Sequence, residues 1–226
     1  MTPSARTAPE PFRFRDCSLT IVSLGRSARN LRELRAELSA VPTGSIQHHF
    51  YDALLRPSFD DREYRNDFAA WTRRMLRDAP LAERLSVIDP LDCADFEDLR
   101  DRLIEVVEER LAEGVWHAEV PEGMEFRFLR SQLVFFDTGA RASSIQELRE
   151  MLPKTTTGSV FYHFVNARFR SPERRDDYST WLLGLGDEGK AIADRLRRID
   201  FQLWSLSETR GRIAAVLSGA DGRVVA

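Results

Sequence analysis

The sequence has few cysteines and no long apolar run, and these absences exclude several classes of protein. Cys17 and Cys93 are its two cysteines, and no CxxC spacing occurs. Neither a disulfide framework nor a cysteine-based zinc site is therefore expected. No apolar stretch reaches the roughly 18 residues that a membrane-spanning helix needs, and the polar N-terminus has no hydrophobic signal-peptide core. We expect a cytoplasmic protein without a membrane segment or membrane partner.

An excess of charge of either sign is also lacking. The 33 Lys and Arg residues nearly balance the 36 Asp and Glu residues, which gives a net charge of −3. Basic runs are no longer than pairs such as Arg73-Arg74. A nucleic-acid-binding protein needs a basic surface to attract phosphates, so no nucleic-acid partner is expected.

Motifs for cofactors and metals are missing, apart from one that misleads. Residues 184–189, GLGDEG, match G-x-G-x-x-G, which binds a dinucleotide when it follows a strand and opens a helix. Here the segment follows a helical pattern, and Asp187 and Glu188 would repel a phosphate. We interpret Gly184, Gly186 and Gly189 as a helix stop. No P-loop, G-x-S-x-G or H-E-x-x-H is present, so neither a cofactor nor a metal is expected.

What the sequence does contain is a repeat. Residues 43–50 read TGSIQHHF and residues 157–164 read TGSVFYHF, and an offset of 114 aligns the chain from Phe12 to Ala53 without a gap. About 16 of 42 aligned pairs are identical, which exceeds what composition produces. Beyond a four-residue deletion, Asp67, Phe68 and Trp71 align with Asp177, Tyr178 and Trp181 at an offset of 110.

The repeat predicts the division of the chain. We expect two homologous copies related by an approximate twofold axis, packed together because each is small for an independent core. The predicted segments are a disordered tail at 1–11, copy 1 at 12–112, a linker at 113–124, copy 2 at 125–217 and a C-terminal tail at 218–226.

Each copy is predicted to be a short β segment followed by four to five helices, which makes the protein mainly α, of the α+β class. Residues 12–24 and 126–136 are rich in aromatic and β-branched residues and precede a glycine, as strands often do. Capping pairs start the next helices: Asn30 with Glu33, and Ser144 with Glu147. A tryptophan helix in copy 1 is indicated by Tyr64, Phe68, Trp71 and Met75 at helical spacing.

One histidine is repeated on an apolar helix face. His49 falls in line with Ile46, Phe50 and Ala53, and His163 falls in line with their counterparts. A buried imidazole needs hydrogen-bond partners. The best candidates begin the tryptophan helices, so we predict the pairs His49–Asp67 and His163–Asp177.

These pairs have two interpretations. In the structural one, favoured here, a buried hydrogen bond fixes the position of one helix against the next. In the functional one, the aspartate orients a histidine that acts as a base or ligand. The structural interpretation is favoured because both copies keep both members and neither copy places a nucleophile. We assign Phe50, Trp71, Phe164 and Trp181 to an aromatic core, since they extend helical apolar stripes.

The residues resemble a known family. S-I-x-x-H-F at 45–50, N-D-F-A-x-W at 66–71, L-x-x-x-L-x-x-I-D at 81–89 and L-R-x-x-L at 99–103 are followed by a degenerate second round with H-F-x-x-A-R at 163–168 and D-Y-S-x-W at 177–181. This pattern resembles the bacterial and archaeal family called domain of unknown function 5752. The resemblance implies a tandem two-copy protein and carries no activity. The second round departs from the pattern at Asp176, which replaces an asparagine.

The functional hypothesis follows from these features. We expect a non-enzymatic binding or assembly module, with a protein or small-molecule partner, that is either a monomer or a homo-oligomer. The alternative is an enzyme or small-molecule sensor with a site at the interface of the two copies, using His49 and Asp67 with His163 and Asp177. A third hypothesis, an obligate subunit of a larger complex, predicts a contiguous exposed apolar patch.

Overall fold

The computed structural model describes residues 10–50, 64–114 and 119–219. Most of the predicted tails, 1–9 and 220–226, and part of the predicted linker, 115–118, lie outside the described residues. The protein is a mixed α and β structure with high helical content and a two-stranded sheet, which confirms the predicted class. None of the described helices combines the length and the apolar character needed to cross a membrane.

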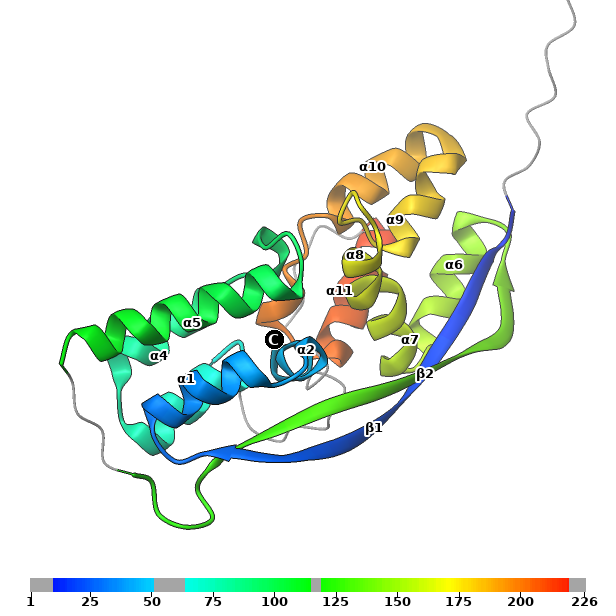
Figure 1. Ribbon diagram of the computed structural model, residues 1–226. Coiled ribbons are helices and arrows are strands. Elements are labelled where there is room, and N and C mark those ends of the chain that lie inside the picture. Colours follow the sequence, from blue (N-terminus) through cyan, green and yellow to red (C-terminus); the bar gives the residue numbers. More distant parts are fainter. Residues whose placement is uncertain (1–9, 51–63, 115–118, 220–226) are drawn as a thin grey trace, which may run out of the picture. The chain divides into compact units, whose positions relative to one another are not determined.

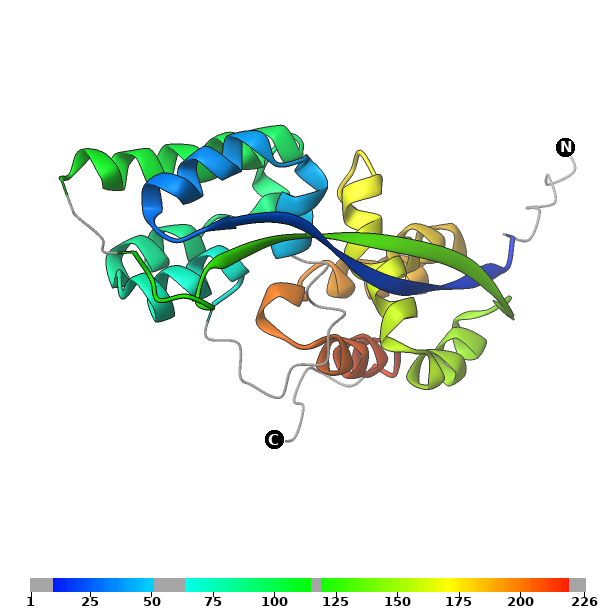
Figure 2. The same cartoon turned by 60° about the horizontal axis from the view of Figure 1, so that its bottom comes forward.

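The strands are longer than predicted. Strand β1 runs from Phe12 to Ala28 and β2 from Phe126 to Ala142, and the two pair in antiparallel fashion along their length (Figures 1 and 2). The predicted strands end before Gly25 and Gly139, but both glycines lie inside the strands, with φ of 65° and 80°. Ser23 Oγ accepts the N–H of Gly25, and Asp137 Oδ1 accepts the N–H of Gly139. Each glycine therefore forms a local irregularity within a continuing strand.

The chain divides into two compact units that do not coincide with the two sequence segments. Unit 2 contains residues 19–133, and unit 1 contains residues 1–18 together with 134–226. Each strand is therefore divided between the units. The helices that follow β1 share a unit with the first half of β2, and the helices that follow β2 share a unit with the first half of β1.

Unit 2 holds the helices of the first segment. Asn30 caps α1 by accepting the N–H of Glu33, as predicted, and Asn66 caps α3 by accepting the N–H of Ala69. Helix α1 packs against α5, and α3 packs against α4. The elements are α1 Leu31–Ala40, α2 Thr43–Phe50, α3 Asp67–Trp71, the π-turn η2 Thr72–Leu76, α4 Ala79–Ser86, the 3₁₀ turn η3 Pro90–Asp92 and α5 Phe96–Ala112.

Unit 1 repeats this order with more interruptions. The predicted cap of Ser144 on Glu147 is present, and so is the capping box of Ser205 and Glu208. The elements are α6 Ile145–Met151, η4 Leu152–Lys154, α7 Thr157–Val160, the π-turn η5 Phe161–Asn166, α8 Ala167–Arg170, α9 Asp177–Leu182, η6 Leu183–Leu185, α10 Gly186–Leu196, η7 Phe201–Leu203 and α11 Leu206–Leu217. Helix α10 packs against α9 and α11.

The tryptophan helix of unit 2 differs from its predicted form. Tyr64 precedes the helix, which begins at Asp67 and widens into a π-turn after Trp71. A π-turn contains more residues per turn than an α-helix, so the 3.6-residue spacing fails beyond that point. Met75, predicted to continue the apolar stripe, is consequently 36% exposed.

The GLGDEG segment, residues 184–189, follows α9 and spans the end of η6 and the first turn of α10, without a preceding strand. Gly186, with φ of 82°, forms the sharp change of direction between η6 and α10, in agreement with a helix stop. Gly189 has another role, because it lies inside α10, where a side chain would meet the carbonyl oxygen of Leu182 at 2.0 Å. It permits the close packing of α10 on α9.

Candidate functional site

The ring of His49 is held between a helix and a strand of unit 2. Its Nδ1 lies 2.9 Å from Oδ2 of Asp67, at the start of α3. Its Nε2 accepts a hydrogen bond of 3.1 Å from the backbone N–H of Leu129 in β2. The imidazole is 3% exposed, whereas the Asp67 side chain reaches solvent. Phe126 packs at 4.7 Å from the imidazole, between ring centres, and stacks on Phe68.

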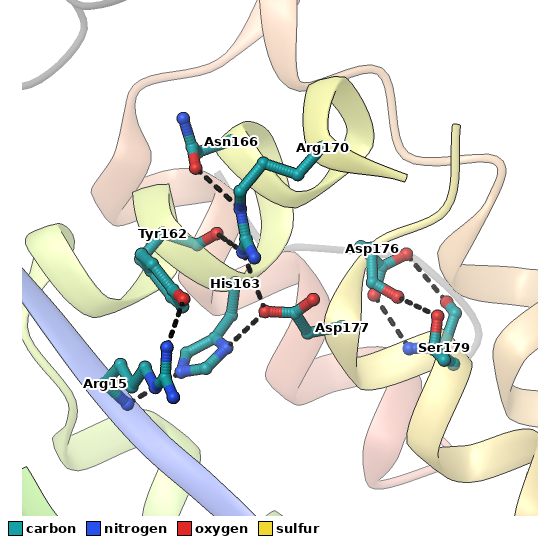
Figure 3. A network of polar contacts seen from close by, with 9 residues as sticks. Arg15, Tyr162, His163, Asn166, Arg170, Asp176, Asp177 and Ser179 are labelled. Carbon is teal, nitrogen blue, oxygen red and sulfur yellow. Dashed lines mark hydrogen bonds and ion pairs between the residues drawn. The ribbon is translucent and has the colours of Figure 1, made fainter. Parts of the chain in front are cut away.

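The ring of His163 has the same surroundings in unit 1. Figure 3 shows it between Arg15 of β1 and Asp177 of α9. Its Nδ1 lies 2.8 Å from Asp177 Oδ2, and its Nε2 accepts from the backbone N–H of Arg15 at 2.8 Å. Phe12 packs on the imidazole and stacks on Tyr178. Arg15 and Leu129, the two N–H donors, are 114 residues apart, as the two histidines are.

The indole groups extend this correspondence. Trp71 Nε1 donates to the carbonyl of Met124, and Trp181 Nε1 donates to the carbonyl of Glu10, each at 2.8 Å. Phe50, Trp71 and Phe164 are buried, but Trp181 is half-buried, which is less than an aromatic core position would require. Each tryptophan thus ties the end of a helix to the residues just before a strand.

These contacts indicate the same tautomer for both histidines. A backbone amide can only donate, so Nε2 of each ring carries the lone pair and Nδ1 carries the proton that is donated to the aspartate. In a catalytic histidine–aspartate pair the second nitrogen faces the reacting group. Here it faces a strand, and the imidazole has no nitrogen left for a substrate or a metal.

Arg170 adds a second contact in unit 1. Its guanidinium donates to Asp177 Oδ2 at 3.0 Å, to Asn166 Oδ1 and to the carbonyl of Tyr162. The guanidinium also lies over the Tyr162 ring. The aligned Arg56 lies outside the described residues. Asp177 therefore receives hydrogen bonds from both a histidine and an arginine, which fixes its carboxylate at the start of α9.

His48 is a buried polar residue that sequence reasoning missed. It is fully buried beside His49, and its Nδ1 lies 2.6 Å from Ser131 Oγ in β2. The aligned Tyr162 also contacts a strand, through its hydroxyl and Arg15. Both aligned positions, 48 and 162, carry an aromatic side chain with a polar group, and this was the sequence signal for a buried contact with a strand.

Three side chains of unit 2 approach the geometry of a metal site. Within the described part of the chain, His48, His49 and Asp67 bring one ligand atom each within 4.8 Å of one another. The fit is poor, because Nδ1 of His49 donates to Asp67 and its Nε2 accepts from the strand. A cation would have to displace the hydrogen bond that joins α2 to α3.

A buried ion pair distinguishes unit 1 from unit 2. Asn66 of unit 2 donates from Nδ2 to the carbonyl of Leu85 at 2.9 Å. Asp176 stands at the aligned position and cannot donate, and there Arg168 Nη2 lies 3.5 Å from the carbonyl of Leu196 and 3.9 Å from Asp176 Oδ2. Burial raises the pKa of Asp176 and lowers the pKa of Arg168. Arg168 thus supplies both the missing donor and the countercharge.

Comparison with known proteins places the chain in a family. The sequence profile of the family of unknown function DUF5752 matches residues 9–218. The chain belongs to the DUF5752 family. Among solved structures, this DUF5752 protein is similar to OrfY from Thermoproteus tenax, with 30% sequence identity and a TM-score of 0.77 over 95% of this chain and 98% of that chain. No curated protein matches it.

Proposed function

We propose that this DUF5752 protein is a non-enzymatic binding or assembly module of the cytoplasm, in which the histidine–aspartate pairs are structural ties. The observation that carries the proposal is the occupation of both nitrogens of His49 and of His163. Each ring joins two helices and one strand, so its full hydrogen-bonding capacity maintains the fold. An imidazole held in this way has no free ring nitrogen for proton transfer.

We further propose that the chain consists of two homologous copies, and their approximate twofold relation remains a prediction. The contacts that recur at aligned positions of the two segments support a common origin, since they involve backbone groups as well as identical side chains. The proposed partner is a protein or a small molecule. The protein itself is proposed to be a monomer or a homo-oligomer.

The alternative, an enzyme or sensor at the interface of the copies, requires both imidazoles to reach a ligand. Each imidazole is about 3% exposed, and each belongs to a different unit. The partly exposed carboxylates of Asp67 and Asp177 are the members of the pairs that solvent reaches. This favours the structural interpretation over the catalytic one.

The test is a set of substitutions that remove one hydrogen bond at a time. In H49Q and H163Q the side-chain amide can still accept a hydrogen bond from the strand N–H but no longer reaches the aspartate. In H49N and H163N the amide can still donate to the aspartate but no longer reaches the strand. Each change is expected to lower the free energy of unfolding by about 1–3 kcal/mol, because a buried group loses its partner. Urea-induced unfolding followed by circular dichroism measures the effect.

The matched control is K190Q, on the exposed face of α10. It is expected to leave stability unchanged, since surface substitutions away from special features have small effects. Histidine variants as stable as K190Q would contradict the structural role, because the rings would then be available for another purpose.

A further inference from the structure

A polar pocket of about 210 Å³ lies in unit 1, next to α9 and α10. Its volume is below the roughly 300–1,000 Å³ of pockets for drug-sized ligands, so it suits a small molecule or one group of a larger one. Four arginines from three separate segments line it. Arg168 belongs to α8, Arg174 and Arg175 precede α9, and Arg197 follows α10. Positive charge therefore reaches the same pocket from three parts of unit 1.

Arg168 is the buried arginine of the pocket, and most of its hydrogen-bonding capacity is unused. Its side chain is 8% exposed. Both of its polar contacts to described residues are made by Nη2, at 3.5 Å to the carbonyl of Leu196 and at 3.9 Å to Oδ2 of Asp176. These distances exceed the roughly 2.7–3.2 Å of a good N–H···O hydrogen bond. Within the described residues Nε and Nη1 form no hydrogen bond. Unpaired buried donors are costly, so an acceptor supplied by a ligand would stabilise this guanidinium.

Three carboxylates also line the pocket, and two of them are engaged by neighbouring serines. Both oxygens of Asp176 accept from Ser179, Oδ1 from its backbone N–H and Oδ2 from its hydroxyl (Figure 3). Glu173 Oε2 accepts from the hydroxyl of Ser171 at 2.9 Å. The third carboxylate, Asp194, is exposed to solvent. Burial also raises the pKa of Asp176, which favours its neutral form. The arginines therefore leave an excess of positive charge.

The positive charge of the pocket is specific to unit 1. Within the described part of the chain, the guanidinium groups of Arg175 and Arg197 form no ion pair. Three of the four arginines align with neutral residues of unit 2, and the fourth, Arg175, aligns with Arg65. The three aligned pairs are Arg168 with Leu54, Arg174 with Tyr64 and Arg197 with Ser86. Arginine in place of a neutral residue at three positions around one pocket indicates an anionic ligand.

We propose that this pocket binds a phosphate group, either as the free ion or as the end of a small phosphate ester. Nη1 of Arg168 donates to one phosphate oxygen, and Arg175 and Arg197 neutralise the remaining charge. A phosphate dianion offers acceptor oxygens in several directions, which matches arginines that come from three segments, whereas a carboxylate offers two oxygens in one plane. The proposal rests on the proposed function, because it specifies the ligand of a binding module.

The first experiment compares anions at constant ionic strength. Isothermal titration calorimetry of the full chain uses about 150 mM NaCl, which screens unspecific attraction to surface charges, and about pH 8, where phosphate is mainly a dianion. Inorganic phosphate and glycerol 3-phosphate are expected to bind. Acetate should bind at least about tenfold more weakly, since it has one charge and fewer acceptor oxygens. Tighter binding of inorganic phosphate assigns the pocket to the free ion, and tighter binding of glycerol 3-phosphate assigns it to esters.

The second experiment gives the pocket the residues of unit 2. The double variant R168L/D176N removes the buried guanidinium together with its carboxylate, and it is expected to remain folded and to abolish binding. R197S replaces an exposed side chain and should weaken phosphate binding about tenfold. The matched control R198S removes the neighbouring exposed arginine, which does not line the pocket, and should bind phosphate as the parent does.

Thermal melting verifies that the variants are folded and gives a second readout of binding. A ligand that binds only the folded state raises the melting temperature as its concentration increases. Phosphate also stabilises proteins in general because it is excluded from their surface, and the rise in R168L/D176N measures this general effect. The parent and R198S should show a larger rise than R168L/D176N, and the excess reports the pocket.

Four results would overturn the proposal: acetate that binds as tightly as phosphate, undiminished binding in folded R168L/D176N, an equal loss of affinity in R197S and R198S, or no binding of phosphate or its ester at millimolar concentration. Failure of the proposal is separable from failure of the proposed function. Hydrolysis of glycerol 3-phosphate, detected as release of inorganic phosphate, would refute the non-enzymatic role and leave the assignment of the pocket intact.

Discussion

At the scale of single residues, the exchange of Asn66 for Asp176 changes the chemistry of a buried helix cap. Both side chains accept a backbone N–H at the start of a helix. Asn66 also donates a hydrogen bond to the carbonyl of Leu85. Asp176 cannot donate, and in unit 1 Arg168 donates to the carbonyl of Leu196 instead. Arg168 lies over Phe164, and within the described residues its Nε has no hydrogen-bond partner. The pair therefore carries two desolvated charges where unit 2 uses one neutral amide.

This comparison predicts a strongly coupled pair of substitutions. R168L alone leaves the Asp176 carboxylate buried without a countercharge and should cost about 3–5 kcal/mol of unfolding free energy. The double variant R168L/D176N, which restores the residue types found at the aligned positions 54 and 66, should be within about 1 kcal/mol of the parent. Urea unfolding of the parent, both single variants and the double variant measures the coupling. R197Q, on the exposed face nearby, is the control, and additive effects would refute the coupling.

The contribution of Asp176 to the free energy of unfolding changes with pH in a definite direction. Burial raises the pKa of Asp176, so the folded state retains the proton to higher pH than the unfolded chain does. The resulting stability is complete below the ordinary pKa of about 3.9 and is lost as the pH rises through the raised value. In D176N this loss is absent. Its stability relative to the parent should therefore increase between pH 4 and pH 7, which urea unfolding at both pH values tests, and a constant difference would contradict it.

At the functional site, the sequence predicted which side chains meet across adjacent helices. His49 and Asp67 are 18 residues apart, and the apolar stripe indicates which face of α2 carries the histidine. The second partner of each imidazole could not be predicted in this way. Leu129 and Arg15 lie 80 and 148 residues from the histidines that they contact, and what they supply is a backbone N–H, which leaves no signal in residue type.

At the scale of elements, the two long strands depend on glycine at one position each. Gly25 and Gly139 have a positive φ, and among the described residues, apart from each glycine and its chain neighbours, no atom lies within 4 Å of the place where a side chain would begin. The requirement is therefore conformational, since a left-handed backbone is unfavourable for residues with a Cβ.

Replacing Gly139 by alanine is therefore expected to lower the free energy of unfolding by about 1–2 kcal/mol. Gly211 in α11 is the matched control, because it too has open space around it but a helical backbone. G211A should raise stability by about 0.5–1 kcal/mol through helix propensity. Thermal and urea unfolding of both variants give the comparison, and a neutral G139A would exclude a constrained backbone at this site.

Element boundaries show where local patterns were insufficient. The caps at Asn30 and Ser144 were predicted, because a side chain that bonds its own first turn is a local event. The π-turns after Trp71 and Val160 were not predicted, since helical spacing assumes 3.6 residues per turn throughout. The full length of the strands was missed because a glycine was interpreted as an end.

At the scale of the whole molecule, each unit contains a segment of β1 and a segment of β2, which come from different halves of the sequence. The helices at 31–112 need Phe126 and the backbone around Leu129, and the helices at 145–217 need Phe12 and the backbone around Arg15. The repeat did not indicate this exchange, because the same residue types begin both strands and either strand could pair with either set of helices.

The exchange predicts the behaviour of the isolated first half. A fragment of residues 10–114 lacks the strand that unit 2 uses, but it contains the aligned one, with Phe12, Phe14 and Arg15. Two such fragments can each supply this strand to the other, so we expect a dimer of twice the fragment mass in sedimentation equilibrium.

F14D in the same fragment places a charge where the aligned Phe128 is fully buried, and it should abolish both the dimer and the cooperative melt. A folded fragment that stays monomeric would show that the exchanged strand is dispensable.

The division of β1 also determines the order in which a newly made chain can acquire its structure. Unit 2 is continuous from residue 19 to residue 133, so its core can close once that stretch has left the ribosome. Residues 10–18 leave the ribosome before unit 2 does, yet the helices that receive them are made after unit 2. During that interval Phe12 and Phe14 have no partner helices and are open to other chains or to a chaperone.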